Sequence, residues 1–218
     1  MRSIKIAPGE FYHVYNRGNL KQNIFTEERD WVRFLFLLLY FQSPIVFYNI
    51  SRSVSSFVRH RVFNIEDNLR QKIIKNRTVE LTCFCLMPNH FHLIVRETKN
   101  NGISNYMQRI QNSYTKYCNI KYQKSGHLLQ GPFKIVRIKD NNQLLYLSTY
   151  IHRNPIELNW ENPRYYYDYT WSSLQDYTNK NRWGELLKTD IIACQFSGKE
   201  KYENFVNTSV AKLEEFND

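Results

Sequence analysis

The pattern of apolar and polar positions divides residues 10–139 into four strands and two helices. Aromatic and β-branched residues alternate in four short segments, as is typical of β-strands: residues 10–15, 78–85, 90–95 and 133–139. A helix is predicted from a polar cap at residues 26–29 to about residue 40. Another is predicted over residues 104–121, where apolar side chains recur about every 3.6 residues. The order β-α-β-β-α-β predicts an α+β fold with an antiparallel sheet, the ferredoxin-like or split βαβ arrangement.

A third helix is expected after the fourth strand. Asp140 and Gln143 resemble a capping box, and Pro155 ends the helical pattern, with Asn154 at a frayed end. The apolar stripe of this helix consists of Leu144, Leu147 and Ile151. Tyr150 and Asn154 lie four residues apart, so their side chains share another face of the helix. The helix is an addition to the ferredoxin-like sheet, of which one face is expected to carry helices and the other to be free for a ligand.

The length of 218 residues suits one domain with additions better than two full domains. We predict that the domain spans residues 1–176. Residues 43–76 are interpreted as a basic insertion, with a Ser-rich stretch at 51–61 and a helix at 65–75. Residues 177–218 are predicted to form a C-terminal appendage.

The charge balance favours a polyanionic partner. Lys and Arg number 30 against 20 acidic residues, which gives a net charge of +10 and a pI near 9.4. Nucleic acid is the first candidate and an anionic membrane surface the second, although charge of this kind also serves solubility. Sixteen Tyr and fourteen Phe add aromatic surface on which unpaired bases can stack, although most will belong to the core.

Other features argue against membrane and disulfide classes. No apolar run reaches 18 residues and no signal-peptide pattern is present, so we expect a cytoplasmic protein, associated with the nucleoid when it is bound to DNA. The four cysteines contain no Cys-x-x-Cys pair, which speaks against a zinc ribbon and a disulfide framework.

Two histidines open the third predicted strand. His90 and His92 follow the turn signal Pro88-Asn89 and point to the same face of the strand. Neutral imidazoles are common ligands of divalent metals, so the pair is a candidate metal site. The alternative is that one histidine is hydrogen-bonded within the sheet and the other is exposed.

These elements together can support cleavage of a phosphodiester. A tyrosine hydroxyl can attack phosphorus and keep the new end as a phosphotyrosine, while two histidines and one amide oxygen leave metal positions open for phosphate and water. Tyr150 and Asn154 would supply the nucleophile and the third ligand. The same spacing occurs at Tyr15/Asn19 and Tyr177/Asn181, but only Tyr150 lies on a capped helix. A helix tyrosine with its hydroxyl at the surface is the structural alternative.

Basic residues near these elements are candidate phosphate contacts. In the fourth predicted strand, alternation places Arg137 and Lys139 on one face, together with the apolar Phe133 and Ile135. The predicted nucleic-acid contacts are Arg17, Lys134, Arg137 and Lys139.

Three segments, in this order, resemble the single-tyrosine HUH transposases of the IS200-like superfamily, and specifically their REP-associated branch. The segments are Met87-Pro88-Asn89-His90-Phe91-His92-Leu93-Ile94, Gly126-His127-Leu128-Leu129-Gln130-Gly131-Pro132-Phe133-Lys134 and Tyr150-Ile151-His152-Arg153-Asn154-Pro155. Residues 11–19 and 169–173 also match, so the resemblance covers residues 8–176.

The resemblance implies roles for individual residues. His90 and His92 would be the metal pair and Tyr150 the nucleophile, with Asn154 as third ligand where insertion-sequence relatives carry Gln. It also implies Mg²⁺ or Mn²⁺ as cofactor, and single-stranded DNA with imperfect hairpins as partner. The REP-associated relatives resemble the monomeric case, so we expect a monomer rather than a homodimer. Residues 156–159 replace the more basic, Gly-containing ending expected of the family, and the stretch at 45–76 is longer than usual.

The resulting hypothesis is a metal-dependent single-stranded DNA endonuclease and strand transferase that acts next to hairpins in DNA transposition. The alternative is a catalytically silent protein that binds DNA or RNA hairpins. An RNA-binding ferredoxin-like module and a metal-dependent hydrolase that uses water are further possibilities. A covalent protein–DNA product separates the first hypothesis from the other three.

Overall fold

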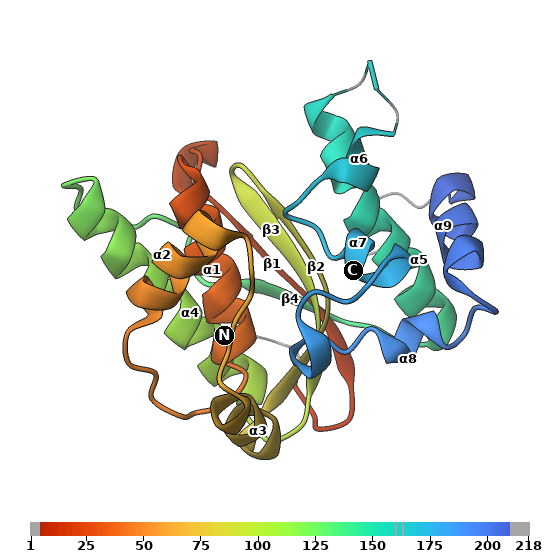
Figure 1. Cartoon of the computed structure of the whole chain (residues 1–218), viewed down its shortest axis with the longest axis horizontal. Helices are drawn as coiled ribbons and strands as arrows, with labels where there is room; N and C mark the ends of the chain where they lie inside the picture. The colour runs from red at the N-terminus through yellow and green to blue at the C-terminus, as the bar shows by residue number, and fades with distance from the viewer. Residues whose placement is uncertain (1–4, 160, 163, 210–218) are drawn as a thin grey trace.

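The computed structural model describes residues 5–159, 161–162 and 164–209. Its centre is a four-stranded antiparallel sheet in the order β2-β3-β1-β4, which confirms the predicted ferredoxin-like arrangement (Figure 1). The strands are β1 (Phe11–Arg17), β2 (Val79–Met87), β3 (His90–Glu97) and β4 (Lys134–Arg137). The turn at Pro88-Asn89 joins β2 to β3 as predicted, with Met87 opposite His90.

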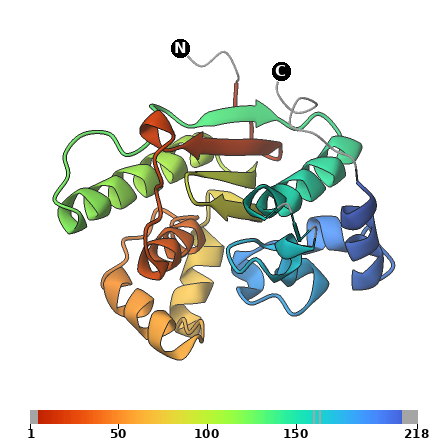
Figure 2. The same ribbon diagram turned by 90° about the horizontal axis from the view of Figure 1, so that it is seen from above.

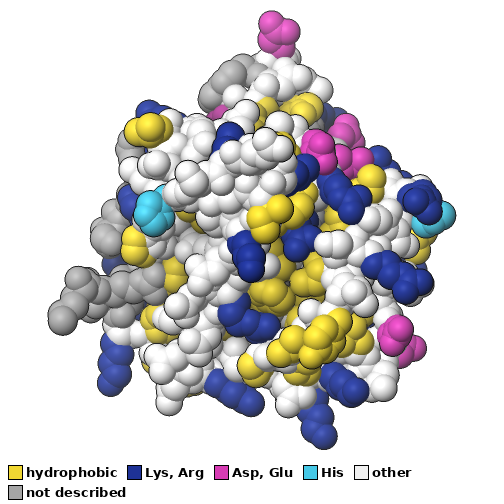
Figure 3. All heavy atoms as spheres, turned by 90° about the vertical axis from the view of Figure 1, so that its left-hand side faces the viewer, with side chains coloured by type: hydrophobic (Ala, Val, Ile, Leu, Met, Phe, Trp, Pro, Cys, Tyr) yellow, Lys and Arg dark blue, Asp and Glu magenta, His cyan; other side chains and the backbone are white. Residues whose placement is uncertain are grey.

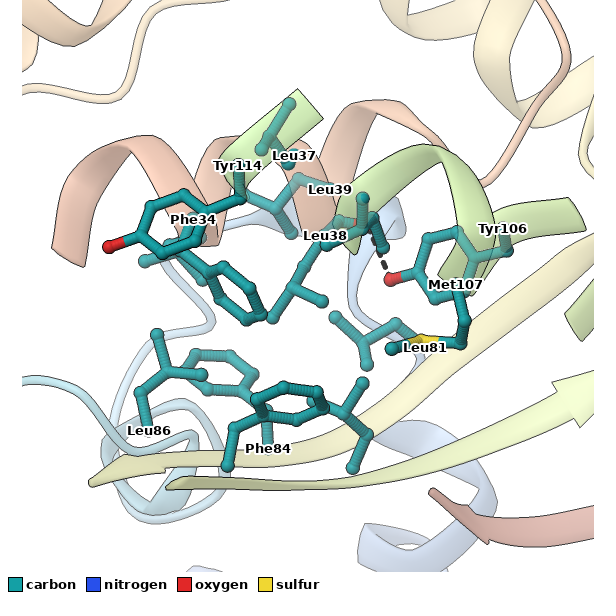
Figure 4. Packing of buried hydrophobic residues seen from close by; sticks show 14 of the residues in the cluster. Phe34, Leu37, Leu38, Leu39, Leu81, Phe84, Leu86, Tyr106, Met107 and Tyr114 are labelled. Carbon is teal, nitrogen blue, oxygen red and sulfur yellow. Dashed lines mark hydrogen bonds between the residues drawn. The ribbon is translucent and has the colours of Figure 1, made fainter. Parts of the chain in front are cut away.

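Two helices, α1 (Glu28–Tyr40) and α4 (Gly102–Lys121), cover one face of the sheet (Figure 2). This face receives alternate side chains of β1 and β3, such as Val14 and Leu93, and these pack against apolar side chains of both helices (Figure 4). The Tyr106 hydroxyl donates to the Leu38 carbonyl (2.7 Å), which satisfies a polar group inside this core. At the start of α4, the buried Glu97 carboxylate accepts from the backbone N–H of Gly102 and Ile103 and so caps the helix.

The insertion forms two helices, α2 (Ile50–His60) and α3 (Asp67–Asn76). The second agrees with the predicted helix, whereas α2 was not expected in the Ser-rich stretch. Its apolar residues Ile50, Val54 and Phe57 recur at helical spacing and contact the first core. The low helix propensity of the serines obscured this pattern in the sequence. In the folded protein, tertiary packing outweighs that low propensity.

The opposite face of the sheet is not left free, contrary to the expectation from sequence. Helix α5 (Asn141–Arg153) lies across it, followed by the 3₁₀ helix η2 (Asn154–Leu158). A second core forms there, because apolar side chains of β2 and β3, such as Cys85 and Ile94, pack against α5. The described residues leave the part of this face near β1 open, and there the side chains are polar or aromatic.

The segment after α5 completes the second layer (Figure 2). Its elements are α6 (Tyr165–Asp168), α7 (Leu174–Thr178), η3 (Gly184–Leu186), α8 (Asp190–Ala193) and α9 (Lys199–Thr208), and the remaining short element is η1 (Asn19–Lys21). Trp183 contributes to the first core, and Tyr202 and Val206 contribute to the second. The part of the predicted C-terminal appendage that is described therefore packs onto the rest of the chain, and residues 210–218 lie outside the described residues. Across the described part of the chain, every helix is too short or too polar to cross a bilayer.

Candidate active site

The open part of the sheet forms a pocket of about 260 Å³. It lies where β1, β3 and β4 meet the C-terminal end of α5. The lining residues are Tyr15, Asn16, Arg17, His90, His92, Gln130, Lys134, Tyr150 and Glu157. The pocket thus gathers the predicted histidine pair, the predicted nucleophile and two of the four predicted basic residues.

The histidine pair lies at the start of β3, as the alternation of side chains predicted. His90 and His92 point to the same side of the sheet, with ring centroids 5.1 Å apart. Burial lowers the pKa of His90, and it lowers the pKa of His92 further, with smaller contributions from His13, His90 and Arg17. Both rings are therefore neutral at pH 7, the form that binds metals.

The tautomer of His90 follows from its neighbours. Its Nδ1 lies 2.6 Å from the Oδ1 of Asn89, an oxygen that only accepts, so Nδ1 carries the proton. The Nε2 of His90 then presents a lone pair to the pocket, 3.3 Å from the Oδ1 of Asn154. Asn89, from the turn, thereby orients the imidazole as second-layer partners of metal-binding histidines do.

Asn154 is also oriented. It is buried at the junction of α5 and η2, in helical conformation (φ −46°, ψ −40°), so the predicted frayed helix end is wrong. Pro155 is the second residue of η2, so the helical path continues as a 3₁₀ turn, although α5 itself ends at Arg153 as the proline predicted. The Asn154 amide donates through Nδ2 to the Tyr150 carbonyl (3.1 Å), which turns Oδ1 toward His90.

The two acceptors that face each other fit a cation. Oδ1 of Asn154 and the lone pair on Nε2 of His90 cannot hydrogen-bond each other, yet they are 3.3 Å apart. Ligands bound at about 2.1 Å and about 90° to one another lie about 3 Å apart, so this spacing suits a shared divalent ion. Among the described residues, no group of three or more His, Cys, Asp or Glu could hold a metal, so a metal here would depend on the Asn154 amide.

Tyr150 projects from α5 toward the histidines. Its ring meets that of His92 edge to face, with centroids 5.6 Å apart. Burial raises the pKa of Tyr150 to about 12, against a lowering hydrogen bond from Asn154, and the carboxylate of Glu157 adds to the rise. The hydroxyl is thus protonated at neutral pH. Of the competing pairs, Tyr177 is buried in the second core and its hydroxyl donates to the Thr82 carbonyl (2.7 Å).

The four predicted phosphate contacts separate into two groups. Arg17 and Lys134 line the pocket, and the Lys134 ammonium lies 5.8 Å from the Tyr15 ring centroid. Arg137 pairs in register with Tyr12, whose side chain belongs to the opposite face, and its guanidinium is bound to Glu10 at 2.9 Å.

Lys139 is not part of the fourth strand, because β4 ends at Arg137. Alternation therefore cannot be extended to it. The predicted pair of charges on one strand face is wrong because Lys139 lies outside the strand, and neither Arg137 nor Lys139 lines the pocket. Lys and Arg side chains are also spread over the face that carries α2 and α4, so charge alone does not locate a DNA path (Figure 3).

Several pocket residues were not identified from sequence. Tyr15 is one of them; it lies on β1 two residues before Arg17, which was predicted, and on the same side of the sheet as His13. Alternation along β1 could have grouped them, and the unassigned His13 contacts His92 directly (2.9 Å). Gln130 lies in the loop before β4, and the sequence did not indicate where this loop packs. The backbone N–H of Gln130 donates to the Arg17 carbonyl and so holds the loop against β1.

The other histidines in the matching segments have different settings. His152 is fully buried, with Nδ1 at 2.8 Å from the Tyr202 hydroxyl and Nε2 at 2.8 Å from that of Ser173. It is a structural residue that joins α5 to α9 and to the start of α7. His127 is exposed and lines a separate groove beside the end of α4.

Comparisons with known proteins gave a family match and a match of fold. A family model described as "Transposase IS200 like" matches residues 45–154. Among solved structures, the chain is similar to a REP-associated tyrosine transposase bound to a REP hairpin, with a TM-score of 0.54 and 13% identity. That match covers 81% of this chain and 83% of the other, and it shows similarity of fold. The comparison with curated proteins found no match.

Proposed function

Because this chain belongs to the family of IS200-like transposases, we propose that it is a metal-dependent endonuclease and strand transferase for single-stranded DNA. It acts next to imperfect hairpins through a 5′-phosphotyrosine on Tyr150, as a member of the REP-associated branch. The observation that carries the proposal is the meeting of two elements in one pocket. Tyr150 and Asn154 occupy successive turns at the end of α5, and His90 and His92 occupy the start of β3.

The chemistry follows from the positions of these groups. The Tyr150 hydroxyl loses its proton to solvent and its oxygen bonds to phosphorus, while the bond from phosphorus to the 3′ oxygen breaks and this oxygen takes up a proton from solvent to leave as a free 3′-hydroxyl. The reverse attack by a 3′-hydroxyl rejoins DNA without an external energy source. Arg17 and Lys134 line the same pocket and attract the flanking phosphates.

His90, His92 and Asn154 would hold the divalent ion. Two neutral imidazoles and one amide oxygen form an incomplete shell that suits Mn²⁺ and Mg²⁺. When bound, the ion would supply Lewis-acid stabilisation of charge on the phosphate oxygens. Asn89 and Tyr150 support the proposal, because they orient His90 and Asn154 before any metal arrives.

The proposed partner is single-stranded DNA that contains an imperfect hairpin. The net charge of +10 suits a polyanion, and the solved structure of similar fold is bound to a REP hairpin. We also propose that the protein works as a monomer, in the cytoplasm and on DNA. Support for the monomer comes from the pocket itself, because one chain supplies both the histidine pair and Tyr150.

A denaturing gel tests the proposal directly. The protein is incubated with a library of hairpin-bearing single-stranded DNA and Mn²⁺, alongside Tyr150→Phe and the matched control Tyr15→Phe, which changes the other tyrosine of the pocket. We expect a covalent protein–DNA band that needs metal, persists in Tyr15→Phe and disappears in Tyr150→Phe. Cleavage without a covalent band would indicate a hydrolase that uses water. Binding without cleavage would favour the silent hairpin-binding protein.

A further inference from the structure

We propose that His13 is a positioning residue that selects the metal-binding tautomer of His92 by accepting a hydrogen bond from its Nδ1. This inference rests on the proposed function, since it assumes that the His92 imidazole binds the divalent ion. It assigns a role to a strand β1 residue that contributes no atom to the predicted ligand set.

His13 is placed for this role by β1. It is buried (1% exposed), and its Nε2 lies 2.9 Å from the Nδ1 of His92. The planes of the two rings lie within 19° of each other, with centroids 5.1 Å apart, so the rings meet edge to edge, and the Tyr15 ring stacks on that of His13 at 4.7 Å. Two packed rings hold the nitrogens in line, so the contact does not depend on a mobile side chain.

The contact leaves one nitrogen of His92 for the pocket. Because Nδ1 faces His13, Nε2 is the nitrogen that can bind a cation, and it must then be deprotonated. In a neutral imidazole the proton then sits on Nδ1, which becomes a donor and requires an acceptor. Among the described residues, the recorded partner of that nitrogen is Nε2 of His13.

The tautomers of the two histidines are therefore linked. One proton occupies the 2.9 Å contact, and two arrangements are possible. If His92 donates through its Nδ1, its Nε2 is free for a cation, and the proton of the His13 ring is then on the Nδ1 of His13. If His13 donates, the Nε2 of His92 carries a proton and cannot bind a metal.

The other nitrogen of His13 fixes neither arrangement. Its Nδ1 is buried, and within the described part of the chain it has no hydrogen-bond partner that would fix the proton elsewhere. The tautomer of His13 is thus free to follow that of His92. His90 differs, because Asn89 fixes its tautomer directly. The tautomer of His90 is thus fixed by the turn between β2 and β3, and that of His92 by the neighbouring strand β1.

Two substitutions at position 13 separate an acceptor from a packing ring. His13→Phe keeps an aromatic ring in the stack and removes the acceptor. His13→Gln loses the ring and keeps an amide oxygen near the position of Nε2. We expect His13→Phe to bind Mn²⁺ about 10–100-fold more weakly, the usual effect of losing a partner behind a ligand, and His13→Gln to stay within about threefold of wild type. Mn²⁺ affinity is measured by electron paramagnetic resonance, and circular dichroism checks that each variant is folded.

A spectroscopic readout reports the tautomer itself. Nitrogen-15 chemical shifts of His92, measured with saturating diamagnetic Mg²⁺, distinguish a protonated Nδ1 from a protonated Nε2. The proposal requires protonated Nδ1 in wild type and in His13→Gln. Protonated Nε2 of His92 under these conditions would overturn it.

The controls separate this inference from the proposed function. Equal Mn²⁺ affinity of His13→Phe and wild type would overturn the role of His13, and weakening confined to His13→Gln would mean a packing role only. Equal weakening in both variants would also overturn it, because the acceptor kept in His13→Gln would then make no difference. His90→Ala is the control for the metal site. If wild type binds Mn²⁺ no better than His90→Ala does, the histidine pair is not a metal site, and the proposed function fails together with this inference.

Discussion

The separation of the basic residues predicts which of them contact DNA phosphate. Lys134 lines the pocket beside Tyr15, whereas Arg137, three residues later on the same strand, is on the other side of the sheet and is bound to Glu10. We therefore expect Lys134→Gln to weaken binding of hairpin-bearing single-stranded DNA and to reduce the salt dependence of binding. Arg137→Gln is a matched control, since it removes the same charge from the same short strand.

The magnitude follows from counterion release. Each phosphate contact on a single strand contributes about 0.7 to the slope of log K against log salt concentration. Between about 50 and 200 mM salt, the logarithm of the salt concentration changes by about 0.6. Over this range each phosphate contact therefore adds about 0.4 to the fall in log K, which is about a 2.6-fold loss of affinity. Loss of both Arg17 and Lys134 should reduce the slope by about 1.4. The loss of affinity between the two salt concentrations should then be about sevenfold smaller than in wild type.

Fluorescence anisotropy of a labelled hairpin substrate over a salt series measures these slopes. Metal is omitted, so that cleavage does not interfere. The reasoning is refuted if Arg137→Gln reduces the slope as much as Lys134→Gln does, or if Lys134→Gln leaves the slope unchanged. A reduced slope for both would mean that DNA wraps from one face of the sheet to the other.

Three further predictions concern the site and its support. Because one chain lines the whole pocket, mixing Tyr150→Phe with His92→Ala should not restore cleavage, and recovery of activity would show a site shared between chains. Asn154→Ala should weaken Mn²⁺ binding about 10–100-fold with little change in melting temperature, and unchanged affinity would remove Asn154 from the ligand set. Asp30→Asn should lower the free energy of unfolding by about 2–3 kcal/mol, because the carboxylate accepts from Lys121 and Tyr122 inside the protein, and urea titration measures it. Burial tends to raise the pKa of Asp30, but hydrogen bonds from Lys121 and Tyr122 outweigh it and lower the pKa, so this stability is present above about pH 4 and is lost below it as Asp30 protonates. A wild type that loses no more stability than Asp30→Asn between pH 5 and 3 would contradict this.

Strong local signals made much of the fold predictable. The turn at Pro88-Asn89 sets the register that places His90 and His92 at the start of β3, and the Asp140 cap opens α5 as expected, with its carboxylate accepting from the Gln143 backbone (2.8 Å). These features depend on residues near each other in the chain. Local chemistry therefore sufficed to predict the order of the elements along the chain and the helix that carries Tyr150.

The errors have a different origin. Alternation was extended over seven residues in the fourth strand, but β4 contains only four, and Lys139 falls outside it. The face of the sheet that was predicted to be free is covered in part by elements far away in the sequence, such as α9, whose Tyr202 belongs to the second core. His13 was left unassigned because its partner His92 is 79 residues away, and only the pairing of β1 with β3 brings the two together. Long-range pairing decides these features, and a single sequence does not display it.

The position of Asn154 shows how a local rule can mislead at a functional site. A residue before proline is disfavoured in helical conformation, and this predicted a frayed end. Here Pro155 occupies the start of η2, where its missing N–H costs little, and Asn154 remains helical and buried. Its side chain is then held by the carbonyl of Tyr150, one turn earlier, so the nucleophile and the amide that faces His90 are fixed on successive turns of one helical segment. Disorder at this junction would move both groups together, and α5 opposes it because Ile151 and His152, on other faces of the helix, pack into the second core.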